Sequence, residues 1–286
     1  MAKTQIIAVL GKKHAGKTTT IEALIRGLTK KGYKVGTVKH IPHTRFTIDT
    51  EGKDTWRHAR AGAEIVVSVA PEEIAIIKKV DSSKYGLKEV IEDFAGRVEV
   101  IVLEGFKELV KIDQNIPKVV AIKTRGEALE AFRGYEPIWA FTGPIKEKPA
   151  SLEVPYIDII EEPDKLVDLV ESRLKPLIKI ARIEDQLPGF NCGNCDYKTC
   201  YELARAIAEN KAKLADCNML ESAGNTLVIK DNNHVLPINP FVQKIIRKAV
   251  LAMISTLKGI TIKGNEAVII SVRETKTSNS IRVDQG

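Results

Sequence analysis

Two groups of residues in this 286-residue sequence have types and spacings that could do chemistry. The first is the run from Gly11 to Thr18, which reads G-x-x-x-x-G-K-T and matches the pattern of a loop that cradles phosphate groups. The second consists of four cysteines, all between positions 192 and 217, whose thiolates could hold a metal ion or a cluster. Each group depends on the elements around it for its position.

The phosphate loop has the context that its chemistry requires. Residues 5–10 form an apolar run that predicts a buried strand, and apolar residues recur at helical spacing from Lys17 to a stop at Gly32. The glycines let successive N–H groups point at phosphate oxygens, and the positive end of the helix dipole adds to the attraction. We expect Lys17 to reach the β- and γ-phosphates and the Thr18 hydroxyl to bind Mg²⁺, so the loop predicts nucleoside triphosphate binding.

Two carboxylates are candidates for the metal ion that accompanies the nucleotide. The apolar strand predicted at 98–103 ends in Glu104, where phosphate-loop proteins place a Mg²⁺-associated acid. Glutamate in place of aspartate makes this match partial, and the side chain could instead cap the following loop. Asp49, in the polar segment after a predicted strand at 34–39, is the next candidate. The predicted nucleotide-contacting residues are Gly11, Lys12, Lys13, His14, Ala15, Gly16, Lys17, Thr18, Thr19, Asp49 and Glu104, with Lys17 and Thr18 catalytic and Thr18 and Glu104 on Mg²⁺.

Strand and helix patterns alternate through the first 175 residues. Further strands are predicted at 64–69, 74–77, 118–122 and 137–141, and helices at 54–61, at 85–95 and from Asp164 onward. The alternation predicts an α/β fold of the phosphate-loop NTPase type, a doubly wound and mostly parallel sheet flanked by helices. No Asn-Lys-x-Asp motif is present, so the residues do not decide between guanine and adenine, and 142–143 is a candidate base-side loop.

The cysteines have the spacing C-x₂-C-x₄-C-x₁₆-C, formed by Cys192, Cys195, Cys200 and Cys217. A cytoplasmic chain with all its cysteines in one short segment is not expected to form disulfides. Zinc sites usually show two separated C-x₂-C pairs, which this spacing does not fit, so an iron–sulfur cluster is favoured, with zinc or free thiols as alternatives. The run from Leu187 to Gly193 and the helical pattern after Cys200 resemble the small four-cysteine module of corrinoid iron–sulfur and electron-transfer proteins. That resemblance implies that the four cysteines hold one [4Fe–4S] cluster.

The patterns divide the chain into four parts, with a linker between the first two. Residues 1–175 are the predicted nucleotide domain, the charged stretch from Lys175-Pro176 to Asp185 the linker, and 183–222 the four-cysteine module, a small α+β iron–sulfur unit. A hairpin at 226–236, a helix at 241–257 and a strand at 267–272 predict a small α+β segment over 223–273. The polar tail, 274–286, is predicted to be disordered.

Composition and charge narrow the class of protein. The sequence is 44% hydrophobic and 28% charged, as in ordinary globular proteins, with a net charge of +7. Residues 1–50 hold ten lysines and arginines against two acids, a net of +8, so the basic surplus lies with the phosphate loop. A small polyanionic ligand explains this as well as nucleic acid does, and nucleic acid is not the favoured partner. With no membrane-length apolar run and no signal peptide, we expect a cytoplasmic protein that does not bind membranes.

Several segments between Gly11 and Lys118 together resemble the family of molybdopterin-guanine dinucleotide biosynthesis protein B, the MobB type. Besides the phosphate loop they are Lys39-His40-x-x-His43, Asp49-x-x-Gly52-Lys53-Asp54-Thr55, Arg57, Ala61-Gly62-Ala63, Leu103-Glu104-Gly105-Phe106-Lys107 and Pro117-Lys118. The resemblance implies a GTP-binding protein that hydrolyses GTP slowly, is usually dimeric, and assists the guanylyltransferase that attaches GMP to molybdopterin. It fades after about residue 160.

The sequence thus predicts a GTP-binding accessory factor of molybdenum or tungsten cofactor synthesis with an attached cluster, and at most a weak GTPase without its partner. Two other classes remain open. One is a nucleotide-gated electron-transfer protein, in which hydrolysis drives reduction of a partner. The other is a zinc-bearing module that binds nucleic acid through the basic first fifty residues.

Overall fold

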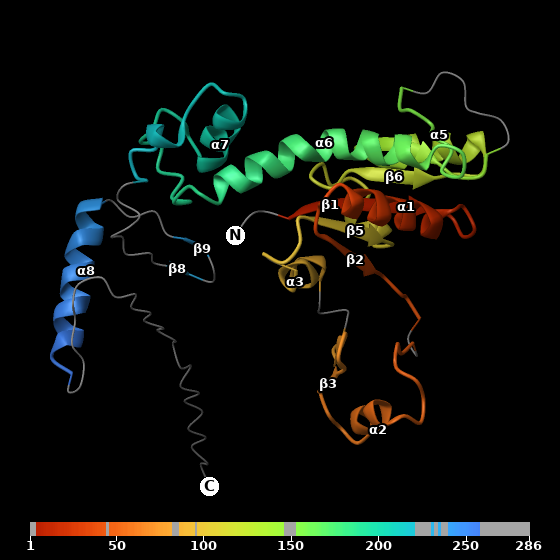
Figure 1. Ribbon diagram of the computed structural model, residues 1–286, viewed down its shortest axis with the longest axis horizontal. Helices are drawn as coiled ribbons and strands as arrows, with labels where there is room; N and C mark the ends of the chain where they lie inside the picture. The colour runs from red at the N-terminus through yellow and green to blue at the C-terminus, as the bar shows by residue number, and fades with distance from the viewer. Residues whose placement is uncertain are drawn as a thin grey trace, which may run out of the picture.

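Five parallel strands form the central sheet of the protein (Figure 1). The computed structural model describes residues 4–43, 46–81, 86–94, 96–145, 153–220, 230–231, 234–235 and 240–257. The order across the sheet is β2-β5-β1-β6-β7, all neighbours parallel. The strands are β1 (Gln5–Gly11), β2 (Val35–Lys39), β5 (Val100–Glu104), β6 (Lys118–Ala121) and β7 (Ile138–Thr142).

The register of the sheet brings the predicted chemistry to one edge. β1 lies between β5 and β6, with Val9 opposite Glu104 and Gly11 opposite Ala121. Because all five strands are parallel, their carboxyl ends meet at the same edge, where ligands bind in open α/β sheets. The apolar runs of β1, β5 and β6 are buried on both faces, as a parallel sheet requires.

Helices cover both faces of the sheet, which confirms the predicted α/β class. On one face, α1 (Lys17–Lys30) and α6 (Pro163–Glu184) pack over alternate β1 residues, Ile7 and Val9. The other face contacts α3 (Leu87–Glu92) and α4 (Lys107–Val110) around Ala8 and Leu10, and α5 (Arg125–Gly134) beside β6. The short helix α4 and the helix α5 were not predicted from the sequence.

A two-stranded ribbon lies apart from the main sheet. Among the described strands, β3 (Ile65–Val69) and β4 (Ile74–Lys78) pair only with each other, antiparallel, and they lie with α2 (Asp54–Arg60) beyond the end of β2 (Figure 1). The predicted strands and helix are therefore present. Their apolar side chains at positions 65, 67, 69, 74 and 76 are each more than half exposed, so the ribbon presents an uncovered apolar face.

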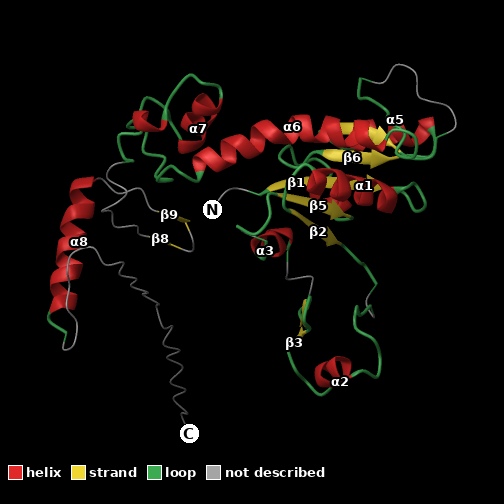
Figure 2. Cartoon of the chain, viewed as in Figure 1, coloured by secondary structure: helices red, strands yellow, loops and turns green. Residues whose placement is uncertain are grey.

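The stretch that was predicted as a linker between the two parts forms the last turns of a long helix. α6 continues to Glu184 as one helix of 22 residues, with Pro176 inside it (Figure 2). Pro176 removes one backbone hydrogen bond, but the apolar stripe through Leu174, Ile178 and Ala181 continues on the far side and is buried. Burial of that stripe outweighs the loss of the bond.

α6 also carries the chain into a second core. Ile178 belongs to the core beneath the sheet, whereas Ile180 packs with Leu203 and Ala204 in the cysteine-bearing module. That module contains α7 (Cys200–Ala208) and a single 3₁₀ turn, Leu214–Asp216. The Lys179 amine of α6 donates a hydrogen bond to the carbonyl of Ala208, at the end of α7, at 2.7 Å.

Beyond the module the structure describes three short elements. β8 (Lys230–Asp231) pairs antiparallel with β9 (His234–Val235), which confirms the hairpin, and α8 (Pro240–Ser255) confirms the helix after it. The predicted strand at 267–272 and the tail at 274–286 lie outside the described residues. None of the helices in the described ranges has the length and apolar character needed to cross a bilayer.

Candidate nucleotide and iron–sulfur sites

The phosphate loop begins at Gly11, the last residue of β1, and runs into the first turn of α1. Gly11 has a φ of +148°, and a Cβ there would stand 2.4 Å from the carbonyl oxygen of Ala121. Gly16, with a φ of +90°, is the N-cap of α1, and His14 also adopts a positive φ of 61°. Only glycine fits the first position, because a side chain would collide with the backbone of β6.

Lys17 lies folded back over this loop. Its amine donates to the carbonyl of Lys12 at 2.8 Å. Burial lowers the pKa of the Lys17 amine; Glu104 opposes that decrease, while Lys39 and Lys123 add to it. The ammonium is thus held among other charges at the carboxyl edge of the sheet, within reach of an anion that enters the loop.

The threonines at the start of α1 differ in exposure. Thr18 and Thr19 are exposed, whereas Thr20 is fully buried and its hydroxyl donates back to the carbonyl of Gly16 at 2.8 Å. Thr20 therefore ties the first helical turn to the loop. The Thr18 hydroxyl, the predicted Mg²⁺ ligand, remains accessible to a ligand from solvent.

Of the two predicted carboxylates, the structure brings only Glu104 to the loop. Glu104 is 17% exposed, forms an ion pair with the Lys39 amine at 3.0 Å, and interacts electrostatically with Lys17. Asp49 accepts hydrogen bonds from the N–H of Thr50 at 2.8 Å and the hydroxyl of Thr55 at 2.9 Å, both within its own segment. Its other oxygen, Oδ2, is buried with no hydrogen-bond partner among the described residues.

Two features of the loop's surroundings were missed or only faintly indicated by the sequence. The Lys123 amine, just after β6, donates to the carbonyl of Lys13 at 3.3 Å. A Cβ on Gly143 would stand 2.3 Å from the Ile122 carbonyl and 2.8 Å from that of Ala15, so the turn after β7 touches the loop. Lys123 lies two residues after β6 and Gly143 directly after β7, and both strands end at the same edge of the sheet, which was the available signal.

The four cysteines line one small cavity in the second core, together with Phe190 and Tyr197. Cys200 and Cys217 are buried, Cys195 is half-buried and Cys192 is exposed. Burial raises the pKa of the Cys217 thiol, and the other three thiols add to the increase. Four thiols that converge in this way suit a cluster held by cysteines, with one corner toward solvent.

The backbone around the thiols is fixed by local hydrogen bonds. Thr199 caps α7 by accepting from the N–H of Glu202 at 3.1 Å, and Asn191 accepts from the N–H of Cys200 at 2.8 Å. Gly193, between the first two cysteines, has a φ of +71°. In the described part of the chain, no three histidine, cysteine or acidic side chains are grouped as ligands of a single metal ion.

Comparison with known proteins matches two parts of the chain to two different families. Residues 6–141 match the family described as "Molybdopterin guanine dinucleotide synthesis protein B", MobB, and residues 187–219 match the family described as "Putative Fe-S cluster". A chain from Methanocaldococcus jannaschii named "Putative molybdopterin-guanine dinucleotide biosynthesis adapter protein" is 29% identical over 258 residues, 90% of this chain and 93% of that one.

A second relative and two solved structures cover the first part of the chain. The "Probable molybdopterin-guanine dinucleotide biosynthesis adapter protein" of Bacillus subtilis is 30% identical over 174 residues, which span 59% of this chain and 93% of that one. The crystal structure of Bacillus subtilis MobB is 26% identical with a TM-score of 0.48, covering 59% and 97% of the two chains. A molybdopterin-guanine biosynthesis protein B structure is 23% identical with a TM-score of 0.46, covering 59% and 99%. This chain therefore belongs to the MobB family, and its second part carries a domain of the matched iron–sulfur family.

Proposed function

We propose that this protein is a GTP-binding adapter of molybdopterin guanine dinucleotide synthesis that carries a [4Fe–4S] cluster and works in the cytoplasm. Its partner would be the guanylyltransferase that joins GMP to molybdopterin, in molybdenum or tungsten cofactor maturation. The observation that carries the proposal is the phosphate loop of a MobB-family chain, formed at the carboxyl edge of the sheet with Lys17 and Glu104 together.

Different residues at this edge would bind the phosphates and the Mg²⁺ ion of GTP. The loop's N–H groups and the N-terminus of α1 would bind the phosphates, and Lys17 would exchange the Lys12 carbonyl for a phosphate oxygen. Thr18 and Glu104 would contribute to the Mg²⁺ shell, which usually takes only one or two protein carboxylates. We propose slow hydrolysis in the isolated protein, since an arginine supplied by a partner can add about 10³–10⁵ in rate.

The second core would hold the cluster through Cys192, Cys195, Cys200 and Cys217, which already line one cavity. When bound, the cluster supplies one-electron transfer. Cys192 is the exposed cysteine, so the corner of the cluster that it holds would be open to a partner or to solvent. The spacing x₂, x₄, x₁₆ and the match of residues 187–219 support a cluster rather than zinc.

We further propose that the protein forms a homodimer through the β3–β4 ribbon. Uncovered apolar residues such as Val67 and Ile76 would be buried against a second copy of the ribbon. Sedimentation is then expected to give twice the chain mass of 31.6 kDa, and a monomer at all concentrations would contradict the dimer.

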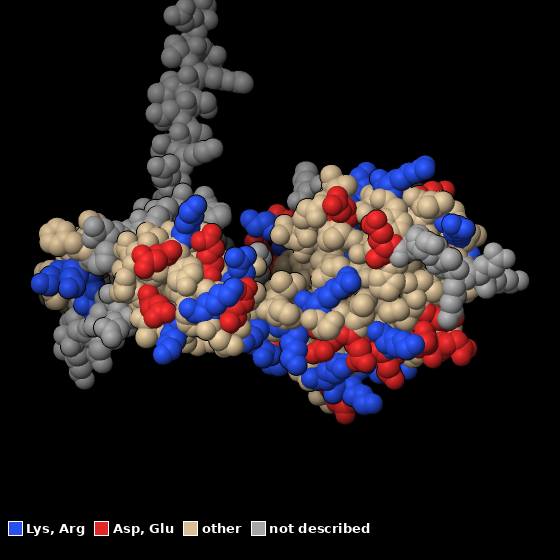
Figure 3. Space-filling view, turned by 90° about the horizontal axis from the view of Figure 1, so that it is seen from above, with Lys and Arg blue, Asp and Glu red and all other residues tan. Residues whose placement is uncertain are grey.

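No nucleic-acid function is proposed, since charges of both signs intermingle on the face shown in Figure 3.

Calorimetric titration with GTP and with ATP tests the proposed function. We expect GTP to bind more tightly than ATP, and Lys17→Ala to weaken GTP binding ten-fold or more, because a charge-assisted contact contributes about 1.5–3 kcal/mol. Lys30→Ala, an exposed lysine in the last turn of the same helix, is the matched control and should bind as the wild type does. Equal affinity for the two nucleotides, or wild-type affinity in Lys17→Ala, would contradict the proposal.

A further inference from the structure

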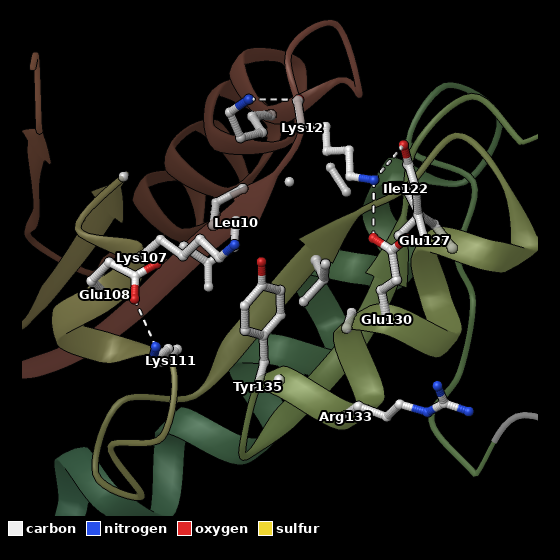
Figure 4. A pocket seen from close by; sticks show the side chains of 18 of the residues that line it. Leu10, Lys12, Lys107, Glu108, Lys111, Ile122, Glu127, Glu130, Arg133 and Tyr135 are labelled. Atoms are coloured by element: carbon white, nitrogen blue, oxygen red, sulfur yellow. Dashed lines mark hydrogen bonds and ion pairs between the residues drawn. The ribbon is translucent and has the colours of Figure 1, made fainter.

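A cavity of about 620 Å³ lies over the face of the sheet opposite α1, between α4 and α5 (Figure 4). Its apolar lining comes from Leu10 on β1, Val120 and Ile122 at the end of β6, and Ala131 on α5. Its volume falls within the range of small-molecule sites, about 300–1,000 Å³. Leu10, Val120 and Ile122 are already buried, so the apolar wall is part of the folded core.

Two polar side chains enter this cavity from opposite walls. Lys107 comes from the first turn of α4 and Tyr135 from the end of α5, and they point toward one another (Figure 4), with the Lys107 amine 5.7 Å from the centre of the Tyr135 ring. Within the described residues, the Tyr135 hydroxyl has no hydrogen bond and Lys107 has no ion pair, although Lys107 interacts electrostatically with Glu108. Two of the other cations that line the cavity are paired, Lys12 with Glu130 at 3.0 Å and Lys111 with Glu108 at 2.7 Å.

The cavity touches one side of the phosphate loop, and the turn after β7, which was predicted to lie beside the base of the nucleotide, touches the other side. Gly11, Lys12 and Lys17 lie on the cavity wall, whereas Gly143 and Pro144 meet the loop at Ala15 and Gly16. Gly105, which directly follows Glu104, also lines the cavity. A ligand in the cavity would therefore lie beside the phosphates of a bound nucleotide and would not compete with its base.

We propose that this cavity binds a small anionic heteroaromatic molecule of the pterin class. The apolar wall and the Tyr135 ring would cover the faces of a flat ring system, and the Lys107 ammonium and the Tyr135 hydroxyl would donate to its anionic group. The choice of a pterin among such molecules rests on the proposed function, whereas the anionic aromatic class rests on the cavity alone. The shared wall at Lys17 places this ligand and the nucleotide in one continuous site.

Fluorescence titration of the full-length protein with 6-carboxypterin, with and without GTP, tests the proposal. We expect saturable binding in both conditions, a loss of about ten-fold or more in Lys107→Ala, and a smaller loss in Tyr135→Phe, which keeps the ring and removes only the hydroxyl. The control Lys175→Ala removes an exposed lysine of α6 outside the cavity and should bind as the wild type does.

Lys107→Ala should also retain wild-type GTP affinity, since Lys107 is exposed and outside the loop. Lack of 6-carboxypterin binding in protein that binds GTP would overturn the cavity proposal and leave the proposed function standing. Equal pterin affinity in wild type and Lys107→Ala, or simple displacement of the pterin by GTP, would also overturn it. Failure to bind GTP in the same sample would instead contradict the proposed function, on which the choice of a pterin depends.

Discussion

Gly11 and Gly143 let three backbone segments meet where the nucleotide is expected. A side chain on Gly11 would collide with β6, and one on Gly143 would collide with both Ile122 and the loop itself at Ala15. Both glycines have positive φ values, +148° and +114°. The loop is therefore held by backbone contacts on two sides before any ligand arrives, which lowers the ordering cost of binding.

Glu104→Gln should weaken GTP binding only when Mg²⁺ is present. The carboxylate lies beside Lys17 and would contribute to the metal shell, so we expect the Mg²⁺ concentration for half-maximal binding to rise about ten-fold. GTP titrations over a Mg²⁺ series, with a metal-free arm, measure this. Lys39→Ala is the matched control, because it removes the ion pair and keeps the carboxylate. The same Mg²⁺ dependence in wild type and Glu104→Gln would show that Glu104 only pairs with Lys39.

Tyr33 should make part of the stability depend on alkaline pH. Burial, together with a hydrogen bond to Glu171, raises the pKa of Tyr33 to about 12 from its ordinary 10.0. The folded state therefore keeps this proton longer than the unfolded state, so the contribution is complete below pH 10 and is lost as pH rises from about 10 to 12. Urea unfolding should show a smaller decrease from pH 9 to 11 in Tyr33→Phe than in wild type. An identical decrease in both proteins would contradict the shift.

At the scale of elements, the sequence predicted the strands of the sheet better than the path between its two cores. β1, β5 and β6 are apolar runs with clear ends, and burial on both faces gives a parallel strand that pattern. Pro176 and the charges around it indicated a linker, but the apolar spacing through Ile178 continues the helix. Whether a proline ends a helix depends on the burial of the residues beyond it, which only the fold decides.

The same limit applies to the candidate site. Lys17 and Glu104 were predicted because a motif or a strand end carries them, and the structure brings them together. Lys123 and the cavity residue Tyr135 belong to no motif, since their places depend on how β6 and α5 pack. Asp49 was predicted from its place after a strand, but β2 leads away to α2 and the carboxylate bonds within its own segment.

Gly27→Ala should loosen the contact between α1 and α6. A Cβ at Gly27 would stand 2.5 Å from a methyl group of Val167, a short branched side chain in a packed core. We expect a loss of about 1–3 kcal/mol in stability, typical of an overfilled core, measured by urea unfolding.

Gly126→Ala is the matched control for this change, because a Cβ on this exposed glycine of α5 would meet nothing closer than 3.8 Å. Alanine there should be neutral or stabilising by about 0.5–1 kcal/mol, as expected for a helical glycine. Equal effects of the two substitutions would mean that helix propensity, and not the approach of α6, governs the cost at Gly27.

At the scale of the whole molecule, α6 joins the nucleotide-binding unit to the cysteine-bearing module. Its first half packs on α1, through contacts that include the ion pair of Asp168 with Lys31, and its last turns pack on α7. The Arg182 guanidinium also pairs with Glu99, next to the start of β5. One helix therefore contributes side chains to both cores.

Metal and sulfide content of the anaerobically purified protein, with iron supplied during expression, tests the central claim most directly, namely that a MobB-type unit and a cluster-binding module share one chain. The four converging thiols predict about four iron and four acid-labile sulfide atoms per chain, with a paramagnetic signal after reduction by dithionite. About one zinc per chain with no sulfide, under the same strictly anaerobic conditions, would contradict the cluster.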